Sequence, residues 1–203
     1  MKNKFLKYLF IVFISLFSQN AFAKELDINA LSVELDKTNK IVYAKGKVEI
    51  SDPLNNIIFS DNAEYDKLKG IVKTIGPTKI ITSEKYEIVG SNIFYDDNKK
   101  IIYSKNNTVV TDIDGNKISV DMFNYLTLKK MFFSKGEIKV LDSRNNKYLF
   151  SEVYIDEKNN KIVGSDIQSY LKENFKGDER NEPRFYANSA TITNENSVFE
   201  KGV

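Results

Sequence analysis

The stretch DKTNKIVYAKGKVEI (residues 36–50) contains the pattern that decides the fold: a polar turn, then an apolar run interrupted by a glycine. Related stretches follow at steps of thirty residues, and their first positions are Asp36, Asp66, Asp96, Leu126 and Asp156. A constant period of this length is typical of proteins built from stacked supersecondary units. We therefore expect one repeated unit to organise the chain, with a degenerate last unit from Arg184 to Val203.

Within each unit, short polar turns separate runs in which apolar and polar residues alternate. Asp and Asn dominate the turns, where their side chains bond to nearby backbone N–H groups. Leu31, Val33 and Leu35 illustrate the alternation, and a period of two predicts half-buried antiparallel strands. The sequence therefore predicts an all-β fold of about 10–12 strands, arranged as stacked antiparallel hairpins.

Small or flexible residues recur ten positions after the turn Asp, at Gly46, Gly76, Asn106 and Gly136. Since Gly and Asn tolerate positive φ, each predicts a bulge or bend within a long strand. Two further segments depart from the repeat. Residues 169–175 are the one helical candidate, and residues 172–183 predict a loop before the last hairpin.

Residues 1–23 have the three parts of a secretory signal peptide. Lys2, Lys4 and Lys7 are followed by an apolar run over residues 9–17 and by the small-residue pattern at 21–23. We expect cleavage after Ala23, which leaves residues 24–203 as one exported domain. The alternative is an uncleaved membrane anchor, but the apolar run is shorter than the roughly 20 residues that span a bilayer.

The composition removes several classes of function. The chain has no His, Cys or Trp, which excludes Ser-His-Asp and Cys-His catalysis, imidazole or thiolate zinc sites and internal disulfides. Its formal charge is +2, and the basic excess lies in the first seven residues. Because nucleic-acid binding needs a clustered surplus of Lys and Arg, we expect no nucleic-acid partner.

Two kinds of acidic motif resemble a calcium-binding loop and an acid–base pair, but neither fits the pattern that such a site needs. The stretch 112–116 (DIDGN) begins like a calcium loop, but its Gly is fourth rather than sixth and no Glu follows at the twelfth position. An Asp-Gly pair between apolar runs instead predicts a hairpin turn. The pairs Asp96/Asp97 and Asp156/Glu157 lie in repeated turns, which favours solvated turn chemistry over acid–base catalysis. We expect neither enzymatic activity nor a metal or cofactor.

Aromatic residues crowd the middle units, and pairs such as Ile41/Tyr43 and Met131/Phe133 would form one continuous face if the hairpins stack in register. One interpretation is a filled core, which ordinary burial preferences favour. The other is an apolar trough that side chains do not fill and that holds hydrocarbon tails. The residue pattern alone leaves both open.

Residues 29–36, 41–50 and 60–66 resemble the repeat of the organic-solvent-tolerance-like (OstA-like) domains of lipopolysaccharide transport. In that family a turn Asp, a Y-x-x-G-x-V strand and an A-x-Y-D return strand recur. The ending, residues 181–203, resembles the close of the periplasmic domain of the family's outer-membrane lipopolysaccharide-assembly member. The resemblance extends over residues 24–203.

The resemblance implies an open, twisted β-jellyroll in the periplasm, associated with the outer membrane. It implies that lipid A acyl chains are bound in the apolar interior, and that end strands pair with the same fold in neighbouring transport proteins. It also implies an outer-membrane lipoprotein partner if a barrel follows. The lipid contacts would come from one alternating set: Val33, Leu35, Ile41, Tyr43, Ala63, Tyr65, Ile93, Tyr95, Ile101, Tyr103, Phe123, Tyr125, Met131 and Phe133.

Two departures from this family member keep alternatives open. The outer-membrane members carry a C-terminal barrel and commonly cysteines, and this sequence has neither. We therefore expect either a domain truncated before the barrel or the soluble bridging protein of the same system; an uncleaved signal would favour the membrane-anchored member. A secreted structural or adhesive β-repeat protein is the alternative from a different class.

Overall fold

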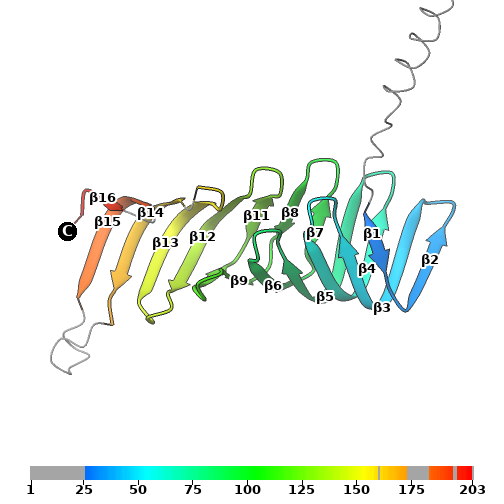
Figure 1. Cartoon of the computed structure of the whole chain (residues 1–203), viewed down its shortest axis with the longest axis horizontal. Helices are drawn as coiled ribbons and strands as arrows, with labels where there is room; N and C mark the ends of the chain where they lie inside the picture. The colour runs from blue at the N-terminus through cyan, green and yellow to red at the C-terminus, as the bar shows by residue number, and fades with distance from the viewer. Residues whose placement is uncertain (1–25, 160, 173–182, 194–195, 203) are drawn as a thin grey trace, which may run out of the picture.

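The computed structural model describes residues 26–159, 161–172, 183–193 and 196–202, and within them sixteen strands form one antiparallel sheet. The strands lie side by side in a long row (Figure 1). Among these residues no helix occurs, so none is long and apolar enough to cross a membrane. The all-β class and the stacked antiparallel hairpins are confirmed. The expected signal peptide and loop residues 173–182 lie outside the described residues.

The strands follow the thirty-residue period. In chain order they are β1 (Asp27–Asn29), β2 (Ser32–Asp36), β3 (Ile41–Ser51), β4 (Ile57–Asp66), β5 (Ile71–Ile81), β6 (Glu87–Ser91), β7 (Phe94–Asp96), β8 (Ile101–Ser104), β9 (Thr108–Thr111), β10 (Lys117–Val120), β11 (Phe123–Leu126), β12 (Met131–Leu141), β13 (Lys147–Asp156), β14 (Lys161–Tyr170), β15 (Arg184–Ile192) and β16 (Ser197–Glu200). Ser169 and Tyr170, from the helical candidate, belong to β14, because the apolar period there is two rather than 3.6.

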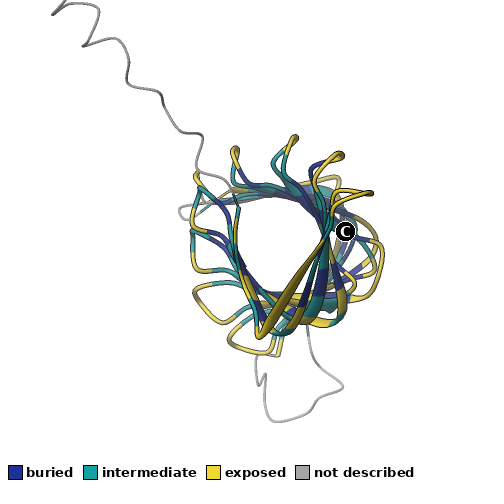
Figure 2. Cartoon of the chain, turned by 90° about the vertical axis from the view of Figure 1, so that its right-hand side faces the viewer, coloured by how far each residue is buried: buried dark blue, intermediate teal, exposed yellow. Residues whose placement is uncertain are grey.

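The sheet has two layers, and each long strand runs from one layer into the other. The first part of β5 pairs with β7 and its second part with β6; β12 likewise pairs first with β11 and then with β10. We call the layer of β2, β7, β8 and β11 the first layer and that of β1, β6, β9 and β10 the second layer. Viewed along the row, the two layers curve around a central region (Figure 2).

The recurring glycines lie where the chain passes from one layer to the other. Gly46, Gly76 and Gly136 have positive φ, and the register shifts near each of them. At Asn106 the strand breaks altogether, between β8 and β9. The predicted bends are therefore confirmed. Three such strands are split completely, into β6/β7, β8/β9 and β10/β11, which is one reason the strands number sixteen rather than ten to twelve.

Two rows of turns join neighbouring units. First-row turns follow Asp36, Asp66, Asp96, Leu126 and Asp156, and backbone bonds such as Asp97 N to Gly70 O (2.8 Å) connect them. Second-row turns occupy residues 52–56, 82–86, 112–116 and 142–146. There Asn side chains connect the units, as when Asn116 Oδ1 accepts a bond from Ser143 N at 2.9 Å. Each row is therefore a ladder of hydrogen bonds parallel to the long axis.

Candidate functional site: the apolar interior and its mouth

Strand register determines which side chains face the space between the layers. Directly opposed residues of antiparallel strands point to the same face, and Tyr95 is opposed by Val72 and Ile102, all fully buried. We call this the inner face. Its residues repeat at steps of thirty: Val42, Val72, Ile102, Phe132 and Ile162; Tyr65, Tyr95, Tyr125 and Ile155; Ile58, Ile88, Ile118 and Tyr148; Ile50, Ile80, Val110 and Val140.

The fourteen residues expected to share one face are divided between two. Eight lie on the inner face: Val33, Leu35, Ala63, Tyr65, Ile93, Tyr95, Phe123 and Tyr125. Six lie on the outer face: Ile41, Tyr43, Ile101, Tyr103, Met131 and Phe133. The single shared face is therefore wrong. The reason is register: the first residue of each long strand is opposed by a turn-side Asp or Leu, and the residue after it points inward.

Sequence reasoning missed the inner residues of the strands that follow each first-row turn. Val42, Val72, Ile102 and Phe132 were available as a signal, because they repeat at thirty as regularly as their outer neighbours. The fifth unit also becomes regular: Ile162, which seemed one residue late, is opposed by Ile155 and occupies the inner position. Lys161 takes the outer position, where solvent accommodates its charge.

The interior is filled in the middle and hollow towards both ends. Tyr95, Ile102, Phe123 and Tyr125 are all 1% exposed or less. Burying side chains of this size stabilises the fold by about 1.5–3 kcal/mol each. A cavity of about 480 Å³ lies near the N-terminal end. One of about 250 Å³, with mainly apolar walls, lies near the C-terminal end.

Different strands line the two cavities. The N-terminal cavity is bounded by Leu26, Ile28, Val42, Tyr65, Lys67 and Asp97. The C-terminal cavity is bounded by residues that include Ile118, Val140, Tyr148, Phe150, Ile162 and Ile192. The second is therefore the more apolar and the better suited to hydrocarbon. A further depression of about 490 Å³ lies on the outer face, where charged side chains such as Lys47 and Lys79 border apolar ones such as Phe59.

Apolar side chains remain exposed where the stack ends. Val33 and Leu35 of β2 point to the inner side but are 53% and 51% exposed, because β3 is the one strand among the described residues that pairs with β2. At the other end Val198 and Phe199 of β16 are also exposed. Unpaired strand edges with exposed apolar residues are templates for the addition of another strand.

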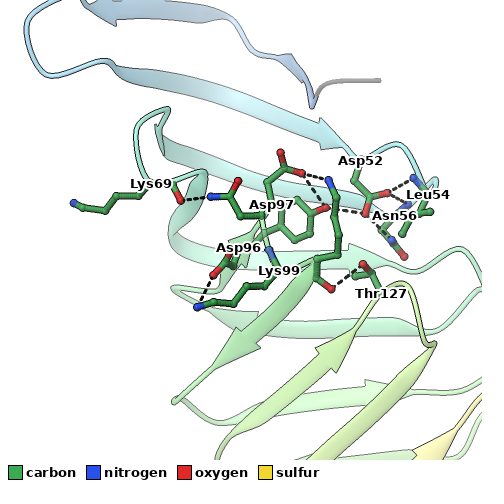
Figure 3. Close-up of polar contacts among 11 residues, drawn as sticks. Asp52, Leu54, Asn56, Lys69, Asp96, Asp97, Lys99 and Thr127 are labelled. Carbon is green, nitrogen blue, oxygen red and sulfur yellow. Dashed lines mark hydrogen bonds and ion pairs between the residues drawn. The ribbon is translucent and has the colours of Figure 1, made fainter. Parts of the chain in front are cut away.

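Polar contacts cross between the two turn rows in the middle of the molecule. The Tyr95 hydroxyl lies 3.3 Å from Asp52 Oδ2, on a second-row turn, and 3.3 Å from Asp97 Oδ1, on a first-row turn. Asp97 is in turn ion-paired with Lys100. Figure 3 shows Asp52 and Asp97 on their two turns, together with the backbone bonds from Leu54 and Asn56 that hold Asp52 in place. Burial and the two nearby carboxylates raise the pKa of Tyr95 well above its usual value.

A second crossing lies one unit further along. Lys130 of the first row is ion-paired with Glu84 of the second row. Beside it the Tyr125 hydroxyl donates a 2.8 Å bond to Glu157 Oε2. Burial raises the pKa of Glu157 to about 7, and the charge of Glu84 acts in the same direction, whereas the Tyr125 bond and Lys130 oppose the shift. We name the eight residues of the two crossings the mouth clasp: Asp52, Glu84, Tyr95, Asp97, Lys100, Tyr125, Lys130 and Glu157.

The acidic motifs bond within their turns, but the expectation that they are all solvated is wrong. Asp96 and Glu157 are buried, and Asp97 and Glu157 also belong to the mouth clasp, because each bonds to a buried tyrosine. Asp112 accepts bonds from the backbone N of Asp114 and Asn116, which confirms residues 112–116 as a hairpin turn between β9 and β10. Asp96 and Asp156 bond to N–H groups of their own turns. Within the described part of the chain, no group of acidic side chains is arranged to hold a metal ion.

The sequence matches no family model and no curated protein. Among solved structures it is similar to LptH from Pseudomonas aeruginosa, described as the LptA homologous periplasmic component of the conserved lipopolysaccharide transport device. The match has a TM-score of 0.31 and 12% sequence identity, and it covers 74% of this chain and 96% of the other.

Proposed function

We propose that this protein is a periplasmic lipopolysaccharide-transport module that carries lipid acyl chains in its inner face. One observation supports this above the others: the interior is lined by apolar columns and is hollow towards both ends of the stack. Burial of hydrocarbon is non-directional and scales with area. Acyl chains would therefore exchange one set of inner contacts for the next with little change in free energy, as transport requires.

The ends of the stack supply the partner surfaces in this proposal. Strand β2 at one end, and β16 with the first part of β15 at the other, have edges to which a further strand can be added. Pairing with the same fold in neighbouring proteins would make their interiors continuous. The lipid's sugars and phosphates would stay outside, because the inner walls offer few polar partners for them.

Among members of this system, we propose the periplasmic domain of the outer-membrane assembly protein LptD, on the sequence of residues 181–203. The soluble bridging protein of the same system is the second candidate. The coding DNA beyond Val203 separates them. A frame that continues into many amphipathic strands of about ten residues supports the first, and a stop codon supports the second.

The experiment for lipid carriage uses two tyrosines of β13 on opposite faces. Tyr148 lines the C-terminal cavity, whereas Tyr154 is 42% exposed and opposes the outer residue Phe133. Each is replaced by the photo-crosslinker benzoylphenylalanine in cells that make lipopolysaccharide. We expect a lipopolysaccharide adduct at position 148 and none at 154.

The two positions control for each other, since they share strand, residue type and expression. Adducts at neither position, in folded protein, would count against lipid carriage and favour a structural or adhesive role. An adduct at 154 alone would place the lipid on the outer face, where Phe133 and Tyr154 form an aromatic pair with ring centroids 4.6 Å apart.

A further inference from the structure

The mouth clasp joins parts of the chain that the sheet itself does not hold together. The two layers are continuous through the long strands on the side of the bends. On the opposite side the layers end in the two separate turn rows, and within each row hydrogen bonds join one turn to the next. Contacts between the rows join residues far apart in sequence, such as Tyr95 with Asp52 and Lys130 with Glu84. The clasp therefore closes the mouth of the interior at mid-length.

Its position coincides with the filled part of the interior. The Tyr95 hydroxyl belongs to the first crossing, and Tyr125, which bonds to Glu157 of the first row, lies beside the second. The rings of both are among the most buried side chains, and neither lines an end cavity. An acyl chain that moves from one cavity to the other has to displace these rings. Separation of the turn rows would give the rings room to move.

The interactions of the clasp stabilise the closed mouth only weakly, which suits a closure that has to open. Lys130 and Glu84 are each 36% exposed, and solvent screens an ion pair between partly exposed side chains, so its net contribution to stability is small compared with that of apolar packing. Lys130 interacts with two carboxylates: it forms a direct ion pair with Glu84, and its charge lowers the pKa of Glu157. Apolar side chains at both partners of each contact would hold the rows together more firmly, whereas replacement of one partner alone leaves the other charge without its ion pair.

We propose that the mouth clasp is a lateral gate: it holds the two turn rows together at mid-length and opens to let acyl chains pass between the end cavities. This rests on the proposed function for the identity of the cargo, but the opening of the rows is a property of the chain alone. The gate residues are those of the clasp. Lys130 is the central one, because its ion pair bridges the rows directly.

The chain has no cysteine, so opening can be measured with two introduced labels. Lys85 and Lys129 are exposed, lie on opposite rows and flank the clasp without belonging to it. Spin labels at Lys85→Cys and Lys129→Cys report the distance between rows by double electron–electron resonance. We expect a narrow distribution in the protein alone. We expect a shift to longer distances with Lys130→Met or Glu84→Gln, and with purified lipopolysaccharide.

A matched control breaks an ion pair on the outer face. Lys79 and Glu87 are 2.5 Å apart and half exposed, and Lys79→Met should leave the distribution unchanged. Circular dichroism verifies that each variant is folded, and Glu84→Gln is the second variant if Lys130→Met does not fold. If neither clasp variant nor lipopolysaccharide changes the distance, the gate is overturned.

Locking the rows tests passage directly. A Glu84→Cys/Lys130→Cys protein is closed with a short bismaleimide, and photo-crosslinkers at Tyr65 and Tyr148 report lipid in the two cavities. We expect adducts at both sites before locking and loss of one of them after it. Undiminished adducts at both sites in the locked protein overturn the gate. No adduct at either site in the unlocked protein contradicts lipid carriage, and the label distances still decide whether the rows open.

Discussion

Glu157 illustrates how a single side chain couples the mouth clasp to pH. Its pKa is raised from 4.5 to about 7, so the folded protein holds its proton more tightly than the unfolded chain does. The free energy of unfolding contributed by this group is therefore greatest below pH 4.5, and it falls as the pH rises towards 7. The groups that face it are Glu84, Lys130 and Tyr125, and of these only Glu84 shares its sign of charge.

Replacing Glu157 by Gln should remove this fall, because Gln accepts the Tyr125 bond without a charge. We expect the variant to be more stable than the parent at pH 8, by at most about 3 kcal/mol for a shift of this size, and the two to converge at pH 4.5. Urea unfolding across this pH range measures the difference. An unchanged pH dependence in Glu157→Gln would show that another group titrates there.

Asn116 has a structural role at the same scale. It donates to Asp112 Oδ2 at 2.6 Å and accepts from Ser143 N of the next turn at 2.9 Å. Asn116→Ala should lower the free energy of unfolding by about 1–3 kcal/mol, since the partners lose their bonds. The exposed Asp114 in the same turn is the control, and Asp114→Ala should change stability by no more than about 0.5 kcal/mol. Equal effects in chemical denaturation would contradict the role of the ladder.

Among the elements, the second-row turns test whether backbone conformation or residue identity is required. Gly115 has φ +84, and the residues thirty positions away on either side, Lys85 and Asn145, are left-handed as well. No atom lies near a Cβ built on Gly115, so only the backbone opposes a side chain there. Gly115→Asn should be close to neutral, whereas Gly115→Val should cost about 1–2 kcal/mol because a β-branched residue is strained at positive φ. Thermal unfolding distinguishes them; equal losses would mean that the turn needs glycine for another reason.

For the whole molecule, the ends of the stack should determine association. Val33 and Leu35 are exposed on the edge strand β2, and charged residues on edge strands discourage pairing. We expect the protein to self-associate with increasing concentration and Val33→Lys/Leu35→Lys to remain monomeric at the same concentrations, as measured by sedimentation equilibrium. Leu128 is 66% exposed on a turn and provides the control, since Leu128→Lys alters no strand edge. Association that survives the β2 substitutions but not the control would place the contact elsewhere.

The repeated unit can be predicted from the sequence alone, because it depends on local interactions. Turn Asp residues bond to the backbone of their own turn, apolar residues at a period of two form strands, and residues that tolerate positive φ lie at the bends. Each of these features depends on residues only a few positions apart, so the sequence is enough to predict it. The confirmed all-β class, the thirty-residue period and the turn at 112–116 are of this kind. Absence of His and Cys likewise needs no structure to exclude the chemistry that depends on them.

The inner face and the contacts that close the mouth could not be predicted from the sequence, because both depend on how distant strands pair. Phe132 and Phe133 are adjacent in one strand and both are apolar: Phe132 stacks on Phe123 in the core, and Phe133 pairs with Tyr154 on the outer face. The alternation of apolar and polar residues therefore does not show which of the two points inward. The choice follows from pairing across strands, and a slip of one residue inverts it. The clasp is even harder to predict from the sequence, because Glu84 and Lys130 lie in different units and meet only when the two layers fold over one another. Contacts of that range depend on the closure of the whole sheet, not on any local pattern.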